Sequence, residues 1–186
     1  MHKIKTAVLI SGRGSNMMAI LKATQNYNYP AKLDIVISNK PSAEGLKKAE
    51  EFGIKTVALD HKAYKNRYEF EKDLDTHLRA SKIQIVCCAG FMRILSPWFV
   101  KRWEGKLLNI HPSLLPKYKG LNTHEKAIES GDTIHGCTVH FINTELDSGK
   151  IILQKSIEIF SDDTPQSLSE RLLIKELEAY PQALKK

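Results

Sequence analysis

The stretch Ile4-Lys5-Thr6-Ala7-Val8-Leu9-Ile10-Ser11-Gly12-Arg13-Gly14-Ser15-Asn16-Met17-Met18-Ala19-Ile20-Leu21 decides the fold class of this chain. Its first seven residues form an apolar run, which is typical of a strand buried on both faces in a parallel sheet. A glycine-containing loop follows at 11–15, and residues 16–21 begin a helix. A buried strand that leads through a short loop into a helix predicts an α/β protein.

The same alternation continues downstream. Phe70, Leu74 and Leu78 recur at helical spacing and indicate an amphipathic helix over 66–81. Ser42 is the expected N-cap of an earlier helix, and Gly53 its expected end. Further strands are predicted at 33–38, 55–59, 83–89 and 106–110. Right-handed βαβ units of this kind build a doubly wound, mostly parallel sheet.

The pattern changes after Gly120. A helix is expected over 124–130, followed by two longer strands at 135–142 and 150–159. Because the connection between these strands is short, they should form an antiparallel pair. An amphipathic helix from Pro165 to Ala179 closes the chain, and no linker or repeat divides it. We therefore expect a single domain over 1–186.

Composition restricts the class of protein. Apolar residues make up 42% of the 186-residue chain, as in an ordinary globular protein. No run approaches the roughly 18 apolar residues of a membrane span, and no signal peptide is evident, so we expect a cytoplasmic protein. The net charge of +7 comes from scattered basic residues. Such a charge would attract phosphorylated ligands, although most of these lysines fit a solvated surface.

The cysteines and histidines do not indicate a metal site. Cys87 and Cys88 are adjacent in an expected strand, so they should point to opposite faces and pack in the core. Neither their spacing nor that of Cys137 suggests a disulfide or a zinc site. The histidines lack the spacing of a metal motif. We expect no metal.

A second informative segment is Asn109-Ile110-His111-Pro112-Ser113-Leu114-Leu115-Pro116-Lys117-Tyr118-Lys119-Gly120. Asn109 and His111 lie two residues apart at a strand end, so their side chains should point to the same side. An amide donor beside a titratable imidazole, on backbone stiffened by prolines, suits a site that stabilises an oxyanion and moves a proton. The alternative is a strand end followed by a proline-rich turn.

The loop at 11–16 suits an anion. Glycines let the backbone approach a ligand, and the N-terminal amides of the following helix bind phosphate. A dinucleotide is a poorer fit, because Met17 replaces the third glycine and no acidic residue ends the second strand. A single phosphate fits better, and a tight turn without ligand is the alternative.

Four motifs together resemble the folate-dependent formyltransferases. They are Ser11 to Asn16, Ala89 to Pro97, the segment His111 to Gly120, and Glu145-Leu146-Asp147-Ser148-Gly149, in the order that the family shows. The resemblance covers nearly the whole chain. It implies a Rossmann-like formyltransferase fold and transfer of a formyl group from 10-formyltetrahydrofolate to the amine of glycinamide ribonucleotide, in purine synthesis.

The resemblance also implies roles for individual residues. Asn109, His111 and Asp147 would be catalytic, with the Asp147 carboxylate supporting charge on His111. Gly14, Ser15 and Asn16 would hold the ribonucleotide phosphate. Folate would be bound by Arg67, Met92, Arg93, Ile94, Leu95 and Asn109. His140 and Glu176 are candidates to line the site. Residues 1–105 would form the nucleotide- and phosphate-binding half, and 106–186 the catalytic and folate-binding half.

Each of these assignments has an alternative. Asp147 could be an ordinary turn aspartate, Arg67 a surface arginine, residues 92–95 a loop capping the core, and His140 a core or surface histidine. Relatives using the same folate site include the methionyl-tRNA enzyme and a formyltetrahydrofolate hydrolase. The first would carry an Arg-Trp-Arg type sequence, where this chain has Lys117-Tyr118-Lys119. From another class, a non-catalytic nucleotide- or nucleic-acid-binding protein would bind RNA in a salt-sensitive way.

We expect small-molecule substrates, no nucleic acid or membrane partner, and a monomer or homodimer. The resemblance further implies a strand and tail beyond Tyr180-Pro181, whereas this sequence stops at Lys186.

Overall fold

The computed structural model describes residues 3–186, which form one seven-stranded sheet in the order β3-β2-β1-β4-β5-β6-β7. The strands are β1 (Ile4–Ile10), β2 (Ala31–Ser38), β3 (Lys55–Ala58), β4 (Ile85–Cys88), β5 (Leu107–His111), β6 (Ile134–Phe141) and β7 (Ile151–Glu158). Neighbouring strands from β3 to β5 are parallel, whereas β5–β6 and β6–β7 are antiparallel. The predicted doubly wound, mostly parallel sheet with an antiparallel pair is confirmed.

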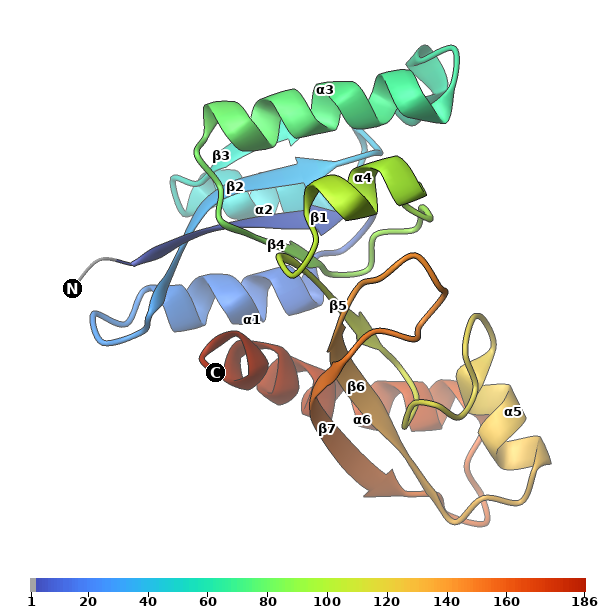
Figure 1. Cartoon of the computed structure of the whole chain (residues 1–186). Helices are drawn as coiled ribbons and strands as arrows, with labels where there is room; N and C mark the ends of the chain where they lie inside the picture. The colour runs from blue at the N-terminus through green and yellow to red at the C-terminus, as the bar shows by residue number, and fades with distance from the viewer. Residues whose placement is uncertain (1–2) are drawn as a thin grey trace.

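Helices cover both faces of the sheet (Figure 1). They are α1 (Ser15–Thr24), α2 (Glu44–Glu51), α3 (Arg67–Ala80), α4 (Pro97–Arg102), α5 (Thr123–Glu129) and α6 (Pro165–Leu184), with a 3-10 turn η1 (His61–Ala63). The buried side chains of α1, α2 and α6 contribute to one core cluster, and those of α3 and α4 to the other. Among the described residues, no helix is long and apolar enough to cross a membrane.

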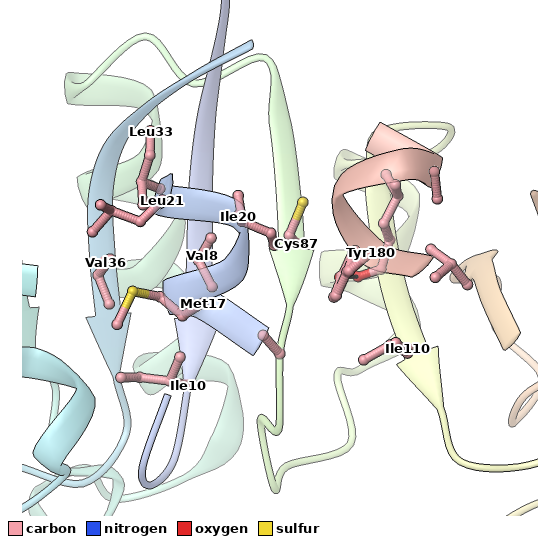
Figure 2. Close-up of a cluster of buried hydrophobic side chains, with 14 of the residues drawn as sticks. Val8, Ile10, Met17, Ile20, Leu21, Leu33, Val36, Cys87, Ile110 and Tyr180 are labelled. Carbon is pink, nitrogen blue, oxygen red and sulfur yellow. Dashed lines mark hydrogen bonds between the residues drawn. The ribbon is translucent and has the colours of Figure 1, made fainter. Parts of the chain in front are cut away.

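The core therefore has two layers, one on each face of the sheet. Figure 2 shows the layer in which Met17 and Ile20 of α1 lie over Val8 and Ile10 of β1. Cys87 belongs to this layer and Cys88 to the other, and both are buried free thiols. The prediction that these neighbours point to opposite faces and pack in the core is confirmed.

The end of the chain differs from the prediction. The last helix does not stop at Ala179 but continues through Pro181 to Leu184. The Tyr180 hydroxyl donates to the carbonyls of Cys88 and Leu108, 2.8 and 3.1 Å away. Tyr180 is fully buried, so its packing and hydrogen bonds stabilise the last turn although proline removes a helix amide.

The predicted cap of α2 is also wrong. The helix begins at Glu44, and its N-cap residue is Ala43, one residue beyond Ser42. Its start is set by a close contact with the α1 loop, because the Gly45 amide donates to the Gly12 carbonyl at 3.0 Å. Tertiary packing, and not a side-chain cap, therefore fixes this helix end.

Candidate active site

A cavity of about 470 Å³ opens at the carboxyl ends of the parallel strands. Its walls come from the loop after β4, the end of β5, the segment that leads into α5 with the first turn of that helix, one residue of α1 and two of α6. Ligand clefts of α/β sheets lie at this edge, where the loops after several strands meet. The cavity is the main candidate for a substrate site.

Asn109 and His111 lie together on the wall of this cavity. Asn109 is half-buried on this wall, so its side-chain amide can reach a ligand in the cavity. The Nε2 atom of His111 lies 2.8 Å from the Tyr118 carbonyl oxygen. Because a carbonyl only accepts, Nε2 carries the proton in this state. His111 must exchange this hydrogen bond to donate from Nε2 to a ligand.

Asp147 lies behind His111 rather than on the cavity wall. One carboxylate oxygen is 3.5 Å from His111 Nδ1 and accepts the Gly120 amide at 2.9 Å. The other is 3.8 Å from His140 Nε2. Asp147 adopts a left-handed φ of 48°, which a non-glycine residue rarely does and which the surrounding contacts must stabilise. The turn therefore directs the carboxylate at His111.

His140 is buried opposite Asn109 on the neighbouring strand β6. It does not line the cavity, and its Nε2 has no hydrogen-bond partner within the described chain. Burial lowers the pKa of His140, partly opposed by the Phe141 carbonyl and Asp147. The lowered pKa favours the neutral ring, and His140 faces the site beside Asp147.

Asn16 and Glu176 form the far wall, where α1 meets α6. The Asn16 amide donates to the Glu176 carboxylate at 3.0 Å, while the Asn16 carbonyl oxygen is buried without a partner in residues 3–186. Burial raises the pKa of Glu176, and the Asn16 hydrogen bond opposes this shift. A half-buried carboxylate beside an unsatisfied amide oxygen suits a ligand group that donates hydrogen bonds.

Gly14 and Ser15 begin α1 beside this wall. Gly14 has a φ of 71°, and a Cβ there would lie 2.9 Å from the Gly45 Cα, so the position requires glycine. The first amides of an α-helix have no partner within the helix. These two residues leave the start of α1 open to an anion, although only Asn16 of the predicted trio lines the cavity.

Only some of the predicted folate residues lie on the cavity wall. Met92 lines the cavity, while Arg93, Ile94, Leu95 and Arg67 lie outside its wall. Arg93 stacks over the Phe70 ring at 5.3 Å, and Arg67 is exposed at the first turn of α3. The Met92 amide donates to Ser11 Oγ at 2.8 Å, which ties this loop to the β1–α1 loop.

A histidine pair at the cavity edge was not predicted. His124 lines the cavity, and its Nδ1 lies 3.1 Å from Nε2 of buried His135. Burial and the nearby His124 lower the pKa of His135 to about 4. The two residues sit on different elements, α5 and β6, so no local pattern in the sequence connects them.

Within residues 3–186, no cluster of three or more histidine, cysteine or acidic side chains could hold a metal ion.

A family model described as formyl transferase matches residues 4–184. The chain belongs to the formyl transferase family. A family member from Haemophilus influenzae, named phosphoribosylglycinamide formyltransferase, is 44% identical over 97% of this chain and 85% of its own length. The crystal structure of a phosphoribosylglycinamide formyltransferase from Brucella melitensis has a TM-score of 0.95 and 40% identity, covering 99% of this chain and 95% of that one. The resemblance to folate-dependent formyltransferases is confirmed.

Another relative is longer. The trifunctional purine biosynthetic protein adenosine-3 of Homo sapiens is 53% identical over 98% of this chain. The chain spans 18% of the length of that protein.

Proposed function

We propose that the chain transfers the formyl group of 10-formyltetrahydrofolate to the amine of glycinamide ribonucleotide. The observation that carries this proposal is the placement of the available Asn109 amide and the His111 imidazole on one cavity wall, with Asp147 against His111. The names of the full-length relatives support the acceptor, and the family supports a folate-derived donor.

The reaction begins when the substrate amine attacks the formyl carbon, and the carbonyl oxygen becomes a tetrahedral oxyanion. Asn109 donates a hydrogen bond to this oxygen, and protonated His111 stabilises its charge. Loss of one such donor commonly raises the barrier by about 3 kcal/mol. Both side chains are carried by β5, and His111 exchanges its hydrogen bond to the Tyr118 carbonyl for the ligand before charge develops.

Asp147 orients His111 and stabilises its positive charge. The carboxylate is itself held by the Gly120 amide, which follows the segment that carries His111. A carboxylate behind an imidazole fixes the ring and favours its charged form. During the reaction the amine loses a proton and folate N10 gains one, and a water bound between Asp147 and His111 could carry it.

The two substrates are assigned to the two halves of the sheet. Residues 1–105 would bind the ribonucleotide phosphate at Gly14, Ser15 and Asn16, and Glu176 would line the site beside Asn16. Residues 106–186 would supply the catalytic groups and part of the folate site. Met92 would contact folate on the cavity wall, and Arg67 and residues 93–95 would contact it from outside that wall.

Steady-state release of tetrahydrofolate, with and without glycinamide ribonucleotide, tests the proposal. The wild-type protein should turn over only with the ribonucleotide, and His111→Ala should abolish turnover. His77→Ala is the matched control, since His77 lies on α3 away from the cavity. Turnover without the ribonucleotide would instead indicate a hydrolase. Absence of both turnover and ligand binding would refute the assignment.

A further inference from the structure

A second cavity, of about 240 Å³, lies at the opposite edge of the sheet. Its lining residues are Arg79, Lys82, Ile83, Arg102, Trp103 and Lys106. Ile83 lies two residues before β4 and Lys106 directly before β5, so this cavity is at the amino ends of the strands whose carboxyl ends form the candidate active site. The two cavities share no lining residue.

The two arginines of this cavity are held in fixed positions. Buried Asp75 accepts a hydrogen bond from Arg79 Nε at 3.0 Å, from Arg102 Nη2 at 2.7 Å and from Trp103 Nε1 at 2.8 Å. The Arg79 guanidinium also stacks over the Trp103 ring at 5.3 Å. A guanidinium has five N–H donors, so each of these side chains keeps donors beyond those that Asp75 uses.

Positive charge exceeds negative charge in this cavity. In the described chain, the ion pairs made by its four cationic side chains all go to Asp75, and Lys82 and Lys106 make none. The carboxyl ends of α3 and α4 lie here as well, and each offsets roughly half a charge. A positive surplus remains after both corrections.

Lys82 occupies a backbone position that favours glycine. It follows the C-cap residue Ser81 of α3 and has a φ of 53°. Glycine is the usual residue at this left-handed position after a helix, because a Cβ is strained there. A lysine at this position places a cation at the mouth of the cavity, although its Cβ strains the backbone.

We propose that this cavity binds a small polyvalent anion of the phosphate class, with pyrophosphate as the test ligand. Fixed guanidinium groups recognise phosphate oxygens through paired N–H donors, and the two lysines add point charges around them. The site is independent of the proposed formyl transfer, since no residue of the candidate active site takes part.

Intrinsic tryptophan fluorescence reports on this cavity. The chain has two tryptophans. Trp103 lines the cavity, and Trp98 lies 5.0 Å beneath the Arg102 guanidinium. Titration of the full chain with pyrophosphate, with inorganic phosphate as a second arm and sodium chloride keeping ionic strength constant, should give a saturable change. Pyrophosphate should bind at least tenfold more tightly than phosphate, because it engages more of the cations.

The double variant Lys82→Gln/Lys106→Gln removes two charges and leaves the Asp75 contacts intact. It should weaken pyrophosphate binding at least tenfold and leave formyl transfer unchanged. Lys55→Gln/Lys62→Gln is the matched control, because it removes the same charge from exposed positions elsewhere. Absence of a saturable signal in the wild type would overturn the proposal. Equal weakening by both double variants would do so too, since it would show only a general charge effect.

Discussion

Buried polar groups at the two edges of the sheet differ in whether they have hydrogen-bond partners. At the carboxyl edge, Asn16 Oδ1 and His140 Nε2 are buried without hydrogen-bond partners in the described chain. At the amino edge, the Asp75 carboxylate is held by two guanidinium groups and an indole. Since buried polar groups are normally satisfied, unsatisfied ones indicate places where a ligand or water completes the structure. The difference separates a cavity whose polar groups a ligand can complete from an ion-pair cluster that is already satisfied within the protein.

The largest effect on turnover should come from a change of Asp147, at the carboxyl edge of the sheet. Asp147→Asn keeps the size of the side chain but removes the charge beside His111. Turnover should fall by roughly two to four orders of magnitude, by analogy with loss of the orienting carboxylate in other acid–base sites. Stability should change little. Steady-state kinetics and urea unfolding of the same preparation measure both quantities.

That comparison would break if Asp147→Asn unfolded readily or kept a near-normal rate. Either result would make Asp147 an ordinary turn residue, the alternative that its sequence position first suggested.

The carboxylate at the other edge should behave in the opposite way. Asp75→Asn weakens the contacts to Arg79, Arg102 and Trp103 and should lower the free energy of unfolding by about 2–3 kcal/mol. The turnover number of the folded fraction should stay within about twofold of wild type, because the mutation is remote from the candidate active-site cavity. Burial alone would raise the pKa of Asp75, but hydrogen bonds from Arg102, Trp103 and Arg79 hold it below its usual value. Loss of turnover in the folded protein would refute the separation of the two edges.

A pH titration sharpens the comparison further. His135 beside the cavity has a pKa lowered to about 4 by burial and by the nearby His124, whereas an unfolded histidine titrates near 6.5. The unfolded chain therefore takes up this proton first as the pH falls. Stability is fully present above pH of about 6.5 and declines as the pH falls towards 4.

His135→Gln should flatten this decline by a few degrees of Tm between pH 6.5 and 4. Some decline remains, because burial also lowers the pKa of His124 and His140. Thermal unfolding across this range, with half-buried His77→Gln as control, gives the measurement. Parallel Tm profiles for wild type and variant would show that His135 does not titrate as the structure indicates.

Local pattern predicted much of this molecule, and long-range packing accounts for the remainder. The apolar run before Gly14 and the helical spacing of Phe70, Leu74 and Leu78 were enough to assign their elements. The extension of α6 through Pro181 was not visible, because it depends on Tyr180 reaching the carbonyls of two distant strands. In contrast, α4 carries a readable signal that was overlooked, a Ser96 cap followed by proline.

The candidate site divides in the same way. Asn109 and His111 lie on one strand, so spacing alone placed them together. The contact of Asp147 with His111 joins a turn to a strand far away in sequence, and only the family resemblance suggested it. Within the Asp75 cluster, the i,i+4 spacing of Asp75 and Arg79 on α3 is a local signal. The contacts of Asp75 with Arg102 and Trp103 had none, because those residues come from α4 and the position after it.

The smallest expected effect tests the carboxyl edge of the sheet at the start of α1. Ser15 opens that helix, and its side chain is assigned to the ribonucleotide phosphate. Ser15→Ala removes one hydrogen bond of about 1 kcal/mol, so the KM for glycinamide ribonucleotide should rise roughly fivefold with kcat unchanged. The KM for the folate should not move, because the predicted folate loop follows β4 and not β1. Ser169→Ala, at a half-buried position of α6 outside the cavity wall, is a control for helix propensity. A rise confined to the KM for folate would mean that the start of α1 binds folate and not the ribonucleotide. Equal rises in both KM values would mean that Ser15 only shapes the cavity on which both substrates depend.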